Sequence, residues 1–186
     1  MGEQSSPSLL LGETVEIENP DGSRAALSRM QKWLVLIVYC SPDHKIAVDT
    51  ASRLLWGRAP HDRLSASLSQ LLYTTNSLLV HHEIISREDD FLRGELPFEN
   101  ALIETPPDAP TADAEFFVER MVSEIASSRL AVLWGRYEED LGQGELRQAL
   151  QTLHQILTVD PNNVDATLDI CWLESRLGRF RSAHQR

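Results

Sequence analysis

Three short clusters hold the side-chain types that bind metals or transfer protons. They are HHE at residues 81–83, DD at 89–90 and EED at 138–140. Adjacent residues do not converge on one ion as helical ligands four residues apart do, and runs of like charge are typical of solvated faces and helix ends. The sequence also holds no glycine-rich phosphate loop and no nucleophile motif. We therefore predict no catalytic residue, no metal site, no cofactor and no small-molecule ligand.

Before residue 97, the spacing of apolar residues is typical first of strands, then of three helices, then of a second pair of strands. Residues 9–18 alternate in part between apolar and polar side chains and lead into the turn sequence NPDG, which predicts a small hairpin. Three segments have apolar residues at helical spacing, and we predict helices over 29–39, 49–56 and 64–79. Residues 83–95 are predicted to form a second hairpin with its turn at 88–90.

This order of elements is the architecture of a winged helix-turn-helix. In that DNA-binding domain the third helix lies in the major groove, and the hairpin, or wing, reaches toward the backbone. Polar side chains hydrogen-bond to base edges or phosphates. On the third predicted helix the candidates for such contacts are Ser65, Ser69, Gln70, Tyr73, Thr74, Asn76 and Ser77. The candidates for contacts to the DNA backbone, on the wing and elsewhere, are Lys45, Arg58, Arg63, Arg87 and Arg93.

Two motifs in this region resemble a known family. They are AVDTASRLLWG at residues 47–57 and ASLSQL at residues 66–71. Both are similar to the DNA-binding domain of bacterial activators of the antibiotic regulatory protein (SARP) type, in which LWG closes the second helix and a third helix of the pattern Ala-Ser-Leu-x-Gln follows. The likeness covers residues 9–96 and implies a winged helix that binds DNA.

The charge of the chain departs from the pattern of that family. Family members carry several Arg or Lys in the second half of the third helix, where residues 73–77 of this chain hold none. The formal net charge is −11; residues 9–96 carry 9 Lys or Arg against 12 Asp or Glu, and residues 97–186 carry 8 against 15. Few counterions would be released on DNA binding, so we expect a weak sequence-independent affinity. Tyr73, on the polar side of the helix, faces either DNA or the wing.

The second half of the chain follows a proline-rich segment. Residues 97–112 hold four prolines and little periodicity, which favours a linker between two domains. Downstream, GELRQA at residues 144–149 recurs as GRFRSA at 178–183, a spacing of 34 residues that is the tetratricopeptide period. Glycine permits the tight turn before the second helix of a repeat, and alanine permits close helix packing. The repeat signature residues are Gly144, Ala149, Pro161, Gly178 and Ala183.

The predicted helical domain spans residues 113–186. We expect a helix over 113–127 to cap the array, a first repeat from Leu130, and an incomplete last repeat that reaches Arg186. This segment resembles the opening part of the bacterial transcriptional activator domain, which follows the winged helix in SARP-type proteins. Asp113 and Phe116 match the Asp-x-x-Phe opening of that domain. The resemblance implies contacts with other proteins, such as RNA polymerase.

Together these patterns predict a mostly α-helical protein with a small β component, a winged helix-turn-helix followed by a tetratricopeptide-like repeat. No apolar segment approaches the length of a membrane helix and no secretory signal is evident, so we expect a cytoplasmic protein without membrane contact. The first hypothesis is a DNA-binding transcriptional regulator, not an enzyme, whose helical repeat contacts a protein partner or a second copy of the chain. The alternative is a protein-interaction module whose winged helix no longer binds DNA.

Overall fold

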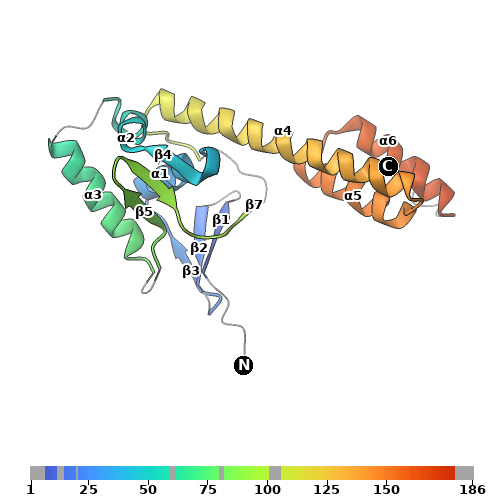
Figure 1. The fold of residues 1–186 in the computed structure, drawn as a ribbon, viewed down its shortest axis with the longest axis horizontal. Helices are drawn as coiled ribbons and strands as arrows, with labels where there is room; N and C mark the ends of the chain where they lie inside the picture. The colour runs from blue at the N-terminus through green and yellow to red at the C-terminus, as the bar shows by residue number, and fades with distance from the viewer. Residues whose placement is uncertain are drawn as a thin grey trace. The chain divides into compact units, whose positions relative to one another are not determined.

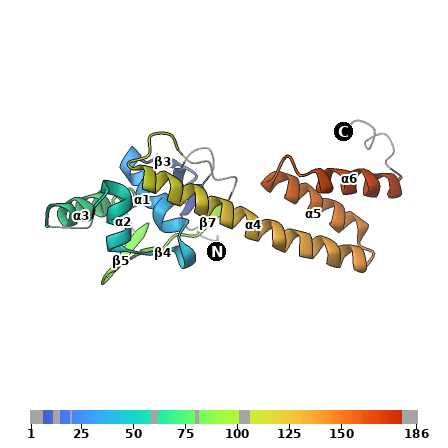
Figure 2. The same ribbon diagram turned by 90° about the horizontal axis from the view of Figure 1, so that it is seen from above.

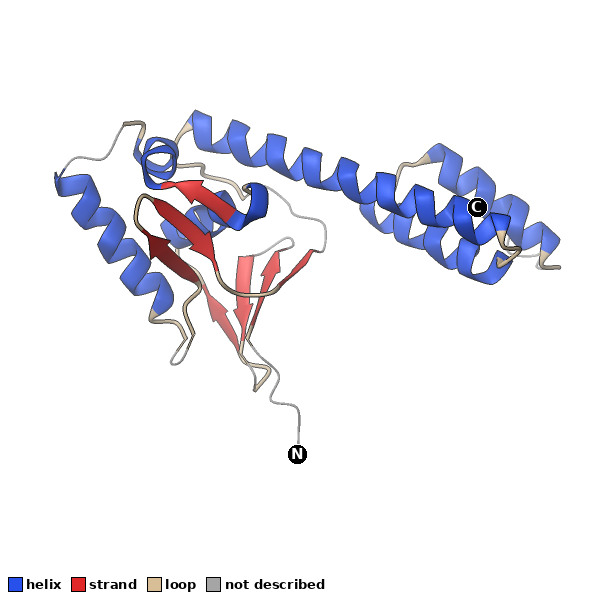
Figure 3. Ribbon diagram, in the orientation of Figure 1, coloured by secondary structure: helices blue, strands red, loops and turns tan. Residues whose placement is uncertain are grey.

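The chain is mostly helical and contains two small β-sheets (Figures 1, 2 and 3). These elements come from a computed structural model. Contacts between Cα atoms group the chain into two compact units, Met1–Val122 and Ser123–Arg186. The mostly helical character with a small β component is as the sequence predicted. The structure describes residues 7–11, 15–19, 21–58, 62–79, 82–100 and 106–178.

The first unit contains a four-stranded sheet in the order β3-β2-β1-β7. Its strands are β1 (Ser8–Leu11), β2 (Val15–Glu18), β3 (Arg24–Ala26) and β7 (Phe98–Asn100). The β1–β2 and β2–β3 pairs are antiparallel, whereas β7 runs parallel to β1. Leu9 and Ile17, which lie opposite each other on β1 and β2, are fully buried. The segment predicted as a linker therefore contributes a strand, β7, to this sheet.

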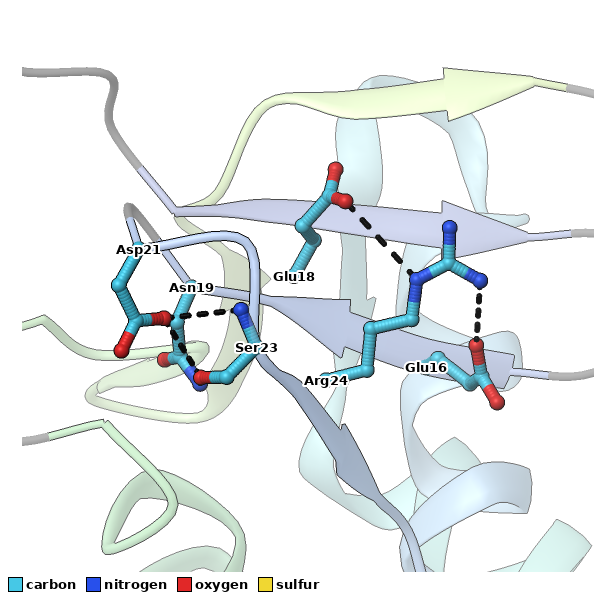
Figure 4. Close-up of polar contacts among 6 residues, drawn as sticks. All are labelled: Glu16, Glu18, Asn19, Asp21, Ser23 and Arg24. Carbon is cyan, nitrogen blue, oxygen red and sulfur yellow. Dashed lines mark hydrogen bonds and ion pairs between the residues drawn. The ribbon is translucent and has the colours of Figure 1, made fainter.

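The turn between β2 and β3 is held by local hydrogen bonds (Figure 4). Asp21 Oδ1 accepts from the backbone N–H of Ser23 at 2.9 Å and from the Ser23 hydroxyl at 2.6 Å. Arg24, at the start of β3, then reaches two carboxylates of β2, with N–O distances of 3.3 Å to Glu16 and 3.8 Å to Glu18. The hairpin predicted from the NPDG turn sequence is thus present.

α1 (Arg29–Tyr39) lies at the centre of the first unit. Every side chain from Trp33 to Cys40 is buried, so from Trp33 onward the helix is covered on all sides and not along one stripe as its spacing predicts. The elements that contact it include α2 (Val48–Trp56), α3 (Asp62–Asn76), β4 (Lys45–Ala47) and β6 (Phe91–Gly94). The fully apolar middle of α1 follows from this enclosure.

The second sheet has the order β4-β6-β5 and contains the second predicted hairpin. β5 (Ile85–Glu88) and β6 are antiparallel and are joined through Asp89, whose φ is 51°, and Asp90. The predicted hairpin began at residue 83, two positions too early. The sequence did not predict β4, because three residues show no usable period and its partner strand β6 lies far along the chain.

Tyr39, the last residue of α1, fixes the β5–β6 hairpin. Its hydroxyl donates to the carbonyl of Ile84 at 2.7 Å and accepts from the N–H of Leu96 at 2.9 Å, so one side chain holds the chain before β5 and after β6. Burial raises the pKa of Tyr39 from its usual value to about 12, so this hydroxyl stays protonated and able to donate even in mildly alkaline solution. Gly94 lies against the ring, since a Cβ at that position would come within 2.7 Å of Tyr39 Cζ.

The second unit is built from α4 (Ala112–Gly142), α5 (Leu146–Val159) and α6 (Val164–Arg176), and its boundary falls inside α4. The three helices share an apolar core that includes Tyr137 and Ile170. The sequence predicted two helices where the structure has α4 alone. One helix continues through residues 127–130 because no glycine or proline interrupts it there.

Replacing Tyr39 with Phe tests the bond that holds the hairpin. The substitution leaves the Leu96 N–H without its buried partner, whereas the Ile84 carbonyl keeps the backbone N–H of Glu95 at 3.1 Å, so we expect Y39F to lower the free energy of unfolding by about 1–3 kcal/mol. Urea denaturation followed by circular dichroism measures it. Tyr73→Phe is the matched control: Tyr73 is 71% exposed, and its change should stay below about 0.5 kcal/mol. Equal losses in both variants would contradict the role given to Tyr39.

Candidate nucleic-acid interface

α3 exposes a polar face that carries no charged residue between positions 64 and 76. Its opposite face is buried through Leu64, Leu68 and Leu72. Tyr73 has 71% of its surface exposed, which excludes the alternative in which it covers the hairpin. Of the predicted DNA-contacting residues, the exposed ones are Ser69, Gln70, Tyr73 and Ser77, and the partly buried ones are Ser65, Thr74 and Asn76.

The hydroxyl groups of this face donate back to their own helix. Ser69, Thr74 and Ser77 each donate to a backbone carbonyl three or four residues earlier, at 2.9, 3.0 and 2.9 Å. In this arrangement the hydroxyl oxygens offer acceptors to the outside and no donors. Among the predicted contact residues, exposed donors come from the Gln70 amide and the Tyr73 hydroxyl. Those two side chains are therefore the best equipped for contacts with nucleic acid.

Asn76 joins the end of α3 to the β5–β6 hairpin. Its Oδ1 accepts from the N–H groups of Ile84 and Ile85, both at 3.0 Å, and its Nδ2 donates to the carbonyl of Ile85 at 2.8 Å. These bonds hold the amide inside the first unit. The DNA contact predicted for Asn76 stays a prediction; in the structure this residue positions α3 against β5.

Three of the predicted backbone-contacting cations lie on the second sheet. Lys45 on β4 and Arg93 on β6 are direct cross-strand neighbours, an arrangement in which like charges repel. Glu88 on β5 forms ion pairs with both, at 3.7 Å to Lys45 Nζ and 3.7 Å to Arg93 Nη1. Arg87 Nε donates to the Asp89 carbonyl at 3.4 Å. All three ion-pair partners are exposed to solvent, so the pairs are weak, and other ions or charged groups can compete for them.

The remaining predicted residues are placed less completely. Arg58 is exposed just after Gly57, which ends α2 with a left-handed φ of 71°. Arg63 belongs to α3, but its side chain lies outside the described residues, as does His81 of the HHE cluster.

Within the described residues, no group of His, Cys, Asp or Glu side chains is arranged to hold a metal ion. In the same part of the chain, no helix combines the length and apolar character needed to cross a membrane.

A groove beside α3 was missed by the sequence reasoning. It has a volume of about 580 Å³ and a largely apolar lining. It lies where α1, the end of α2 and the first half of α3 meet, so its existence depends on helix angles that no local pattern reveals. The lining residues are Met30, Trp56, Ala66, Ser67, Gln70 and Leu71. Gln70 thus borders both the groove and the polar face of α3.

Comparison with known proteins adds no assignment to this geometry. The chain matches no protein-family model and no curated protein. The likeness to SARP-type activators therefore stays a prediction from residues 47–57 and 66–71. Those segments cover the last residue of β4, all of α2 with its glycine cap, and the middle of α3.

The repeat signature residues lie at turns and in the core of the second unit. Gly144, between α4 and α5, and Gly178, after α6, take left-handed φ values of 77° and 75°. They occupy the same place in the 34-residue pattern and have the same backbone conformation. Ala149 is fully buried on α5, Pro161 is exposed in the turn before α6, and Ala183 lies outside the described residues.

Replacing Asn76 with Ala tests its positioning role. Loss of the amide leaves the N–H groups of Ile84 and Ile85 unpaired, and we expect a loss of about 1–3 kcal/mol in the free energy of unfolding. Amide hydrogen exchange gives a local readout, because those two N–H groups should exchange faster in N76A. Gln70→Ala is the control on the exposed face of the same helix, and it should leave the free energy of unfolding and the exchange of both N–H groups unchanged. Unaltered exchange in N76A would remove Asn76 from this role.

Proposed function

We propose that residues 9–96 form a winged helix that binds DNA in a bacterial transcriptional regulator of the SARP type, and that the helical unit contacts a protein partner. One observation carries the proposal: α3 presents an exposed polar face beside a hairpin, with Asn76 bonded to the start of that hairpin. In winged helices this pair of elements meets the major groove and the DNA backbone. The order of strands, three helices and hairpin supports the same proposal.

Gln70 is the central residue of the proposed contact. A glutamine amide offers one donor and one acceptor, which is the pair that the major-groove edge of adenine requires. Tyr73, one turn further along, presents an exposed hydroxyl for a base or a phosphate. Arg87 and Arg93 lie on the hairpin that would reach the DNA backbone.

The direct test is a gel-shift titration with DNA from the promoter region of the protein's own gene, at low and at moderate salt. We expect a specific complex that weakens as salt rises. Q70A should lose about 10- to 100-fold in affinity for the specific site and little on random DNA, since a bidentate base contact is worth about 1–3 kcal/mol. Gln143→Ala, at an exposed glutamine that follows α4, is the matched control. Absence of any shift at low salt would refute DNA binding.

A second candidate is a protein-interaction module whose winged helix does not bind DNA. It is favoured by the pairing of Glu88 with both Lys45 and Arg93, because these cations are already partly neutralised within the protein. The formal net charge of −11 also favours this candidate, because a negatively charged protein is repelled by the phosphates of DNA. Helical repeats commonly provide extended contact surfaces, so the second unit alone would serve this function.

Replacing Glu88 with Gln separates the two candidates. If the hairpin contacts DNA, E88Q frees Lys45 and Arg93 for phosphates, and the slope of log affinity against log salt should steepen by up to about 2. Affinity at low salt should rise by about 3- to 10-fold, with little change at high salt. Glu16→Gln, which breaks an ion pair with Arg24 on the first sheet, is the control and should leave the slope unaltered. An unchanged slope in E88Q favours the protein-interaction module.

A further inference from the structure

α6 carries a stripe of exposed apolar side chains. Val164, Leu168 and Trp172 follow one another at intervals of four residues, with 68%, 62% and 44% of their surfaces exposed. The other side of the helix is fully buried against the second unit through Ala166, Ile170 and Leu173. Large apolar side chains gathered on one face of a helix mark a contact surface more often than single exposed ones do.

Two opposite charges flank this stripe at its two ends. Asp165 lies in the first turn of α6 and Arg176 in the last, where its guanidinium stacks over the Trp172 ring at 4.4 Å from the centroid. At about 100° of rotation per residue, Asp165 and Arg176 fall on the same side of the stripe, about 60° and 80° from Leu168. Within the described part of the chain neither residue forms an ion pair.

We infer that this stripe is the interface with a second copy of the chain, formed by two α6 helices packed antiparallel about a two-fold axis. In an antiparallel helix pair the same flank of each helix faces the other, so Asp165 meets the partner's Arg176, and the same contact recurs by symmetry. In a parallel pair the same flank of the two helices lies on opposite sides of the interface, and Asp165 and Arg176 lie at opposite ends, so neither charge meets an opposite one. The charges therefore select the antiparallel arrangement.

The apolar residues fit the same arrangement. With the two-fold axis at the level of Ile170, Leu168 packs on the partner's Trp172, and Val164 lies beside the partner's Arg176. A surface whose exposed apolar residues and opposite charges both find partners in a second copy favours that copy over an unrelated partner. This inference does not depend on DNA binding.

The first test is the association state of the full chain, measured by sedimentation equilibrium. We expect a dimer, and L168E should raise its dissociation constant by about 100-fold or more, because the substituted side chain enters the interface twice. Phe116→Glu is the matched control: Phe116 is also a large exposed apolar residue, at 68%, but lies on α4 in the first unit. A wild-type chain that is monomeric at about 100 µM, or a dimer indifferent to L168E, would overturn the inference.

The second test exchanges the two charges. D165R and R176D should each weaken the dimer by about 10-fold, because each places like charges together at both ends of the interface. The double variant D165R/R176D restores opposite charges and should return the dissociation constant to within about 3-fold of the wild type. Failure of this rescue, or unchanged association in the single variants, would overturn the antiparallel arrangement. Circular dichroism confirms that each variant keeps its helix content.

Discussion

The arrangement of the first unit depends on one buried hydroxyl group. Tyr39 ends the helix that the core encloses, so its position is set by the packing of that helix, and its hydroxyl then fixes the chain on either side of the β5–β6 hairpin. Asn76 performs the corresponding task for α3, whose end it binds to the start of β5. Two polar side chains thus fix the position of α3 beside the β5–β6 hairpin, and the proposed DNA-binding surface depends on that position.

The chemistry of that surface differs from that of a strongly basic DNA-binding protein. The polar face of α3 offers an amide, hydroxyls and a phenol, and Glu88 partly neutralises two of the cations of the second sheet. If this surface binds DNA as proposed, hydrogen-bond pattern and shape would supply most of the discrimination, because little free energy would come from counterion release. The proposed regulator would then gain specificity at the expense of affinity, and association into a dimer through α6 would recover affinity by engaging two sites at once.

The sequence predicted elements whose causes are local. Gly57 predicted where α2 ends, and the leucines at helical spacing predicted which face of α3 is buried. The strands β4 and β7 were missed because each is only three residues long and pairs with a partner far away in the chain. Asn76 shows a limit of the same kind, since a polar residue on a helix can face solvent or a neighbouring strand, and only the packing of α3 against the hairpin decides which.

We propose that the polar face of α3 and the β5–β6 hairpin form one DNA-binding surface. Chemical-shift mapping locates such a surface, with isotope-labelled protein and a duplex from the promoter region of its own gene at low salt. We expect the largest shifts on Ser69, Gln70 and Tyr73 and on the hairpin residues around Arg87, with α5 and α6 unaffected. Shifts that are absent, or confined to α5 and α6, would contradict it.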